Sequence, residues 1–123
     1  MPNSKTVLLA DTRSYRMEWE ALIGYQVGTH SIRFHEAWSV LSAVAATQRE
    51  CPNLIITELL GAEHGCWMIR ELRRIAPDSR IIVVSANNTD RIADAIHAGA
   101  VEYFTKPLDY DRFIGTVRRY LEL

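Results

Sequence analysis

The chain of 123 residues is long enough for one domain with one hydrophobic core, and 48% of its residues are apolar. Its formal net charge of −1 does not imply whole-molecule attraction to nucleic acid or to a membrane surface. No apolar run approaches the roughly 20 residues of a membrane span, and the first residues do not resemble a signal peptide. We therefore expect a cytosolic protein with no membrane insertion and no direct nucleic-acid contact, in which Cys51 and Cys66 are free thiols.

Short apolar runs of strand length alternate with longer amphipathic patterns along the chain. The expected strands, in chain order, are at 6–10, at 32–35, where Ile32 and Phe34 alternate with Arg33 and His35, and at 54–58, 80–85 and 101–104. A helix is expected after each strand. The apolar faces of these helices carry, in the same order, Tyr15, Trp19, Leu22 and Ile23; Ala37, Leu41, Val44 and Ala45; Met68, Leu72 and Ile75; Ile92 and Ile96; and Phe113, Val117 and Leu121. Trp19, Trp38 and Trp67 fall on helical segments, and we expect them to be packing residues.

Turn and capping residues fall between these patterns. Pro77 stops the third helical pattern, and Asn88 or Thr89 is placed to cap the fourth. Gly99 stands where a left-handed residue ends a helix, and Asp109 is a candidate N-cap for the last helix. Because five strands alternate with five helices, we predict a parallel sheet covered by helices on both faces. This is a three-layer α/β/α sandwich in which residues 1–123 form a single domain.

Four polar side chains follow four different predicted strands. Asp11, Glu58 and Ser85 each end an apolar run, and Lys106 closely follows the last run. The carboxyl ends of parallel strands meet at one edge of the sheet, and ligands of open α/β sheets bind at that edge. We therefore expect two acids, a hydroxyl and an amine to share one site.

The stretches around these residues carry a resemblance to a known family. AGAVEYFTKP at 98–107 with the helix that follows, PNLIITEL at 52–59, VLLAD at 7–11 and VVSA at 83–86 together resemble response-regulator receiver domains over essentially the whole chain. The resemblance implies a flavodoxin-like fold with strand order 2-1-3-4-5. It also implies signal transduction in a two-component system, without enzymatic activity.

In that family, two acids after the first strand hold Mg²⁺ beside a phosphate-accepting aspartate, and a Ser/Thr and a Lys contact the phosphoryl group. By this resemblance Asp11 is the first metal-binding acid, and Ser85 and Lys106 are the phosphate contacts. Glu58 occupies the position of the phosphoacceptor, and Thr12 stands in place of the second acid. Since Mg²⁺ prefers several oxygen ligands, we expect weak Mg²⁺ binding and no required cofactor.

The departures from the family pattern are concentrated at this site. Besides Thr12 and Glu58, the loop at 59–65 is one residue short and lacks the usual Met-Pro pair. Glu is one methylene longer than Asp, which moves the carboxylate by about 1.5 Å, and in-line transfer tolerates such misplacement poorly. We expect a receiver that works without aspartyl phosphorylation. In it, Glu58 either stands in for the phosphorylated aspartate or fills a dead site on a binding scaffold.

In the family, the surface of helix four, strand five and helix five carries the signal outward, and an aromatic residue on strand five changes rotamer. Tyr103 matches that residue; the alternative is a half-buried tyrosine that does not switch. The mixed charge of this surface suits a protein partner, such as an output domain, a kinase or another signalling protein, or a homodimer. The resemblance also implies a cis bond between Lys106 and Pro107.

Three other interpretations remain open at this stage. Glu58 itself could accept a phosphoryl group, as in a conventional receiver. The chain could be the regulatory input module of a longer transcription regulator or ATPase. A small enzyme built on Asp11, Glu58 and Lys106 is disfavoured, because the sequence lacks a Gly-rich phosphate loop, a GxSxG elbow and a nearby His base.

Overall fold

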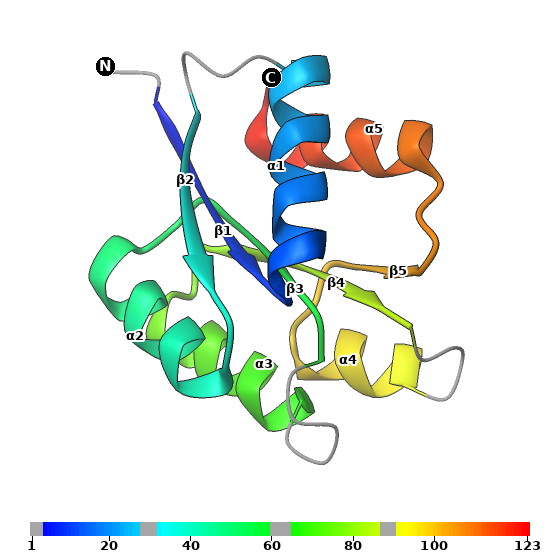
Figure 1. The fold of residues 1–123 in the computed structure, drawn as a ribbon. Helices are drawn as coiled ribbons and strands as arrows, with labels where there is room; N and C mark the ends of the chain where they lie inside the picture. Colours follow the sequence, from blue (N-terminus) through cyan, green and yellow to red (C-terminus); the bar gives the residue numbers. More distant parts are fainter. Residues whose placement is uncertain (1–3, 28–31, 60–64, 87–90) are drawn as a thin grey trace.

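A computed structural model describes residues 4–27, 32–59, 65–86 and 91–123. Strands and helices alternate through these residues (Figure 1). They are β1 (Lys5–Ala10), α1 (Arg13–Val27), β2 (Ile32–Ala37), α2 (Val40–Glu50), β3 (Leu54–Thr57), α3 (Gly65–Ile75), β4 (Arg80–Ser85), α4 (Ile92–Ala98), β5 (Glu102–Thr105) and α5 (Tyr110–Leu121). The strands pair in parallel in the order β2-β1-β3-β4-β5. The predicted three-layer sandwich and its strand order are confirmed.

The sheet separates two hydrophobic cores. Successive side chains of a strand point to opposite faces, so Leu8 and Ile55 belong to one core while Leu9 and Ile56 belong to the other. Figure 1 shows α1 and α5 on one side of the sheet and α2, α3 and α4 on the other. Because the central strands are buried on both faces, they are almost continuously apolar instead of alternating with polar residues.

The helix ends largely follow the predicted capping residues. Asp109 caps α5 by accepting a hydrogen bond from the Arg112 amide, and Gly99 ends α4 with φ of 132°, as predicted. Ser39 caps α2 in a reciprocal capping box with Ser42, a cap that was not among those predicted. The candidate caps Asn88 and Thr89 lie outside the described residues.

The packing face of α2 differs from the predicted one. Leu41 is 81% exposed and Ala45 is also exposed, whereas Ala43, Ala46 and Thr47 are buried against the sheet. The helix thus lies on its small residues, which let it approach the sheet closely. Trp38 precedes the helix and is 69% exposed, so the expectation that it packs in the interior is wrong. Trp19 is fully buried as expected, and Trp67 is half-exposed at the start of α3.

The described helices are also short. The longest, α1, has 15 residues, which is fewer than the roughly 20 that cross a bilayer. Of the helices described, none has the length and apolar character that a membrane crossing requires.

Candidate functional site

Three of the predicted site residues meet at the carboxyl edge of the sheet. Asp11 follows β1, Glu58 follows β3 and Lys106 follows β5. The Lys106 Nζ lies 2.6 Å from Asp11 Oδ2 and 2.9 Å from Glu58 Oε2. These side chains are only 8%, 3% and 18% exposed for Lys106, Asp11 and Glu58 respectively. The site is therefore a largely desolvated ammonium bridging two carboxylates.

The Glu58 carboxylate is held from both of its oxygens. Oε1 accepts a hydrogen bond of 2.8 Å from the Leu59 amide, and Oε2, besides contacting Lys106, lies 3.4 Å from the Ala86 amide nitrogen. The Thr57 hydroxyl donates to the Glu58 carbonyl at 2.7 Å and fixes the backbone there. The longer side chain thus turns inward over the sheet edge instead of extending into solvent.

The Asp11 contacts come from the start of α1. Its Oδ1 accepts a hydrogen bond of 2.6 Å from the Thr12 amide. Its carbonyl accepts one of 2.7 Å from Arg16 Nη1. Arg16 is in turn held by Glu36 of β2, with 3.6 Å between Arg16 Nε and Glu36 Oε1. Asp11 is therefore fixed at both backbone and side chain, and its remaining oxygen faces Lys106.

The Lys106 ammonium also faces aromatic rings. Its Nζ lies 3.5 Å from the centre of the Tyr15 ring and 5.9 Å from that of Trp19. Burial works to lower the pKa of Lys106, but the hydrogen bonds to Asp11 and then to Glu58 outweigh it and raise the pKa above 10.5. The amine is therefore charged at neutral pH.

The other predicted residues lie at the same edge with different surroundings. Ser85 is fully buried at the end of β4, and its carbonyl accepts a hydrogen bond from the Lys106 amide at 3.0 Å. Thr12 is exposed and contacts Asp11 through its amide. Tyr103 is 7% exposed, so it is buried and not half-buried; its role as a residue that changes rotamer stays a prediction. The Lys106–Pro107 bond is cis, as expected. Within the loop at 59–65, residues 60–64 lie outside the described residues.

Two contributing residues were not assigned a role from the sequence. Tyr15 was recognised only as a helix-face residue, and Arg16 was not singled out. Both lie in the first turn of α1, directly after β1, and this position brings them to the sheet edge. That proximity to Asp11 was the only available signal, because helical periodicity does not specify which ring will face an amine.

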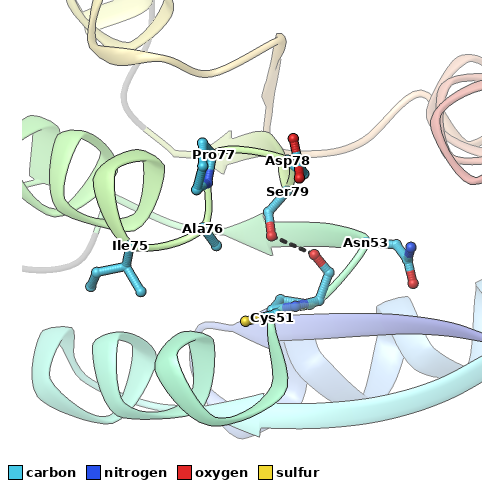
Figure 2. Close-up of a pocket in the computed structure, with 8 residues that line it drawn as sticks. Cys51, Asn53, Ile75, Ala76, Pro77, Asp78 and Ser79 are labelled. Carbon is cyan, nitrogen blue, oxygen red and sulfur yellow. Dashed lines mark hydrogen bonds between the residues drawn. The ribbon is translucent and has the colours of Figure 1, made fainter.

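Two of the pockets lined by described residues lie at opposite edges of the sheet. One of about 400 Å³ is lined by Tyr15, Glu18, Ala86, Lys106, Pro107, Leu108 and Tyr110, beside the candidate site. The other, of about 180 Å³, lies at the amino edge between Cys51 and Ser79, where the Ser79 hydroxyl donates to the Pro52 carbonyl (Figure 2). Only the first pocket touches the residues predicted to carry function.

The donor set fits Mg²⁺ poorly. Asp11 and Glu58 are the two acids at the site, and both direct an oxygen to the Lys106 ammonium. Thr12, at the position of a second acid, supplies no carboxylate. In the described ranges, no cluster of three or more His, Cys, Asp or Glu residues is placed to hold a metal ion. A divalent cation would have to displace the ammonium to gain these ligands.

Comparison with known proteins gives consistent matches. The family described as "Response regulator receiver domain" matches residues 7–118. The chain is 33% identical over 102 residues to the alginate biosynthesis transcriptional regulatory protein AlgB of Pseudomonas aeruginosa, covering 81% of this chain and 21% of that protein. It is 30% identical to the chemotaxis protein CheY of Bacillus subtilis, covering 70% of this chain and 73% of that protein.

Solved structures agree on the fold. A response regulator from Thermotoga maritima superposes with a TM-score of 0.81 at 24% identity, covering 98% of this chain and 99% of that one. The chain spans only about a fifth to a quarter of the length of the first regulators that it matches. With a family match that extends over most of its length, the chain belongs to the response regulator receiver domain family.

Proposed function

We propose that this chain is a receiver domain that transmits a signal by protein–protein contact without aspartyl phosphorylation. Its Glu58 carboxylate takes the place of a phosphoryl group. The observation that carries the proposal is the 2.9 Å contact between Glu58 Oε2 and Lys106 Nζ, in a site where both side chains are mostly buried. A glutamate on a dead scaffold has no need of this contact and could equally extend into solvent, so the inward carboxylate supports mimicry.

The same geometry disfavours phosphorylation of Glu58. A nucleophile must approach phosphorus in line, with an oxygen free to attack. Here Oε1 accepts a hydrogen bond from the Leu59 amide and Oε2 is engaged by Lys106. The added methylene already displaces the carboxylate by about 1.5 Å relative to an aspartate. A conventional phosphoacceptor role would require these contacts to be broken first.

The contact is strong enough to bias a receiver but not to lock it. Exposed ion pairs contribute about 0–1 kcal/mol, and breaking a fully buried pair costs about 3–5 kcal/mol. The Lys106–Glu58 pair is intermediate in burial, so we assign it about 1–2 kcal/mol. That shifts a two-state ratio by roughly five- to thirtyfold. Conformations of one protein are commonly separated by a few kcal/mol, so a population shift is expected.

The partner surface proposed is that of α4, β5 and α5, which lies next to Lys106 in the chain. Its charged side chains are mixed: Arg112 pairs with Glu102 at 3.8 Å and stacks on Phe104, with 4.5 Å between its guanidinium carbon and the ring centre. This surface suits an output domain, a kinase or a second copy of the chain. Because the chain spans a small part of its regulator relatives, a role as input module of a longer regulator is included in this proposal.

Acetyl phosphate treatment tests the input chemistry. The purified protein is incubated with acetyl phosphate and Mg²⁺, quenched in acid and weighed intact. We expect no adduct on the native chain. Glu58→Asp, which restores the shorter carboxylate, is the matched comparison. A stoichiometric phosphoryl adduct on Glu58 of the native chain would overturn the proposal.

Amide NMR then separates mimicry from a dead site. If Glu58 biases the receiver, Glu58→Gln will shift amide resonances at Tyr103 and along α4 and α5, away from the substitution. The control is Glu20→Gln, which removes an exposed carboxylate of α1. Shifts confined to the immediate neighbours of residue 58 would identify the dead scaffold instead.

A further inference from the structure

Tyr15 is in direct contact with the central cation of the site. It lies in the first turn of α1, and the centre of its ring is 3.5 Å from the Lys106 Nζ. A cation within about 6 Å of a ring centre is attracted by the negative face of the ring, more strongly where water is excluded. Lys106 is 8% exposed. The contact therefore belongs to the stronger, desolvated class.

The three N–H bonds of the ammonium are accounted for by three neighbours. A lysine ammonium carries three donors and no acceptor. Asp11 and Glu58 accept at 2.6 and 2.9 Å, and the Tyr15 ring covers a further side. An incoming anion that used Lys106 would have to displace one of these neighbours.

Tyr15 also stands at the boundary between the ammonium and solvent. Tyr15 and Lys106 both line the pocket of about 400 Å³ beside α5. The ring also packs against the fully buried Trp19, with ring centres 6.0 Å apart and planes inclined by 38°, and the Trp19 ring centre is itself 5.9 Å from the Lys106 Nζ. The ring is thus supported from the core, and its removal would widen the pocket beside Lys106 and admit more water to the amine.

We propose that Tyr15 is a positioning residue, which holds the Lys106 ammonium between Asp11 and Glu58 and closes it to water and to added anions. The inference deepens the proposed function and rests on it for its biological meaning. It explains how a receiver can keep its lysine engaged with an internal carboxylate in place of a phosphoryl group. A simple packing role for Tyr15 predicts no special behaviour of the amine.

The lysine content of the chain makes the test specific. Lys5 and Lys106 are the only lysines, so ¹⁵N-lysine labelling yields two ammonium groups, and Lys5 serves as internal reference. The rate at which the Lys106 ammonium protons exchange with water is measured by NMR for the native chain, Tyr15→Leu and Tyr15→Phe. The matched control is Tyr25→Leu, the same change at an 87% exposed tyrosine of the same helix.

We expect Tyr15→Leu to accelerate exchange about thirtyfold, the factor that corresponds to losing a desolvated cation–π contact. Tyr15→Phe keeps the ring and should stay within about twofold of the native rate, as should Tyr25→Leu. If Tyr15→Leu does not give a native amide spectrum, Tyr15→Met, which retains apolar bulk without a ring, takes its place.

Exchange in Tyr15→Leu within twofold of the native rate overturns the inference. So does equal acceleration in Tyr15→Phe, because the hydroxyl and not the ring would then matter. The measurement uses no phosphate donor and no partner. Its failure is therefore distinct from failure of the proposed function, which the acetyl phosphate experiment decides separately.

Discussion

The energetic coupling between Lys106 and Glu58 is the quantity on which the proposed mechanism depends. This coupling can be measured with Lys106→Met, Glu58→Gln and the double variant. Glu58→Gln keeps the shape of the side chain and removes its charge, and Lys106→Met keeps most of the aliphatic stem. The change in unfolding free energy of the double variant, minus the sum of the changes in the two single variants, isolates the pairwise term, because each single change removes the same contact.

The expected magnitude can be worked out from the distances. At an effective dielectric constant of about 20, charges 2.9 Å apart attract by about 6 kcal/mol. Glu58 is also repelled by Asp11: the two oxygens that contact Lys106 are at most about 5.5 Å apart, because they lie 2.6 and 2.9 Å from the same Nζ, and this repulsion costs at least about 3 kcal/mol at the same dielectric constant. Desolvation of the two groups offsets much of the remainder. We expect Glu58→Gln to cost about 1 kcal/mol.

In a chain that already carries Lys106→Met, the effect of Glu58→Gln on stability should change from a loss to a gain. Lys106→Met leaves the Asp11 and Glu58 carboxylates facing each other without a cation, and we expect it to cost about 3 kcal/mol. In that background, Glu58→Gln relieves the repulsion and should restore about 1 kcal/mol. The resulting coupling energy is about 2 kcal/mol, within the range for residues in contact.

Urea denaturation at pH 7 and low salt, followed by far-UV circular dichroism, measures these differences. With a slope of about 1–3 kcal/mol per molar urea, a change of 1 kcal/mol moves the midpoint by roughly half a molar. Glu20→Gln combined with Lys106→Met is the control cycle and should show no coupling. Effects of independent substitutions add to within about 0.3 kcal/mol. A Lys106–Glu58 coupling energy below that value would refute the mechanism in which Glu58 acts through its contact with Lys106.

Two further predictions concern pH and the end of α4. Because the folded-state pKa of Lys106 lies above 10.5, the stabilisation from its contacts is fully present at lower pH and is lost as pH rises through the raised pKa. The stability difference between the native chain and Lys106→Met should therefore hold from pH 7 to about 10 and then shrink; a Lys106 ¹³Cε titration midpoint below 10.5 contradicts this. Gly99→Ala should destabilise by about 1–3 kcal/mol in thermal denaturation, because φ is 132° and the new Cβ would lie 3.1 Å from Arg73 Cδ. Gly115→Ala in α5 is the matched control. Nothing lies within 4 Å of its new Cβ, so a gain in stability of about 0.5–1 kcal/mol is expected. Equal effects on stability at both glycines would argue against backbone strain at residue 99.

The fold could be predicted because the strands are buried on both faces. Runs such as Leu54 to Thr57 have no polar interruption, and this pattern is specific to central parallel strands. The face of α2 was predicted wrongly because alanines are weak markers of burial: the pattern favoured Leu41, whereas the helix approaches the sheet through Ala43 and Ala46. Periodicity reports apolar spacing and does not measure how closely a helix packs.

The candidate site could be predicted only as a set of residues at one edge. The topology brings Asp11, Glu58 and Lys106 together, since each follows a parallel strand. The direction of each side chain depends on contacts that no spacing encodes, such as the Leu59 amide at Glu58 Oε1 and the Tyr15 ring at Lys106. These contacts distinguish an engaged glutamate from a solvent-directed one.

The position of β5 links Lys106 to the edge of the sheet and to both cores. It is an edge strand with only β4 beside it, so hydrogen bonds hold it from one side. Its consecutive residues Tyr103 and Phe104 belong to opposite cores, and Lys106 follows directly at its end. A displacement of the Lys106 backbone would therefore be transmitted to an edge strand that contacts both cores. If Glu58 changes the affinity of a partner for α4 or α5, as proposed, then binding of that partner must change the free energy of the Lys106–Glu58 contact by the same amount.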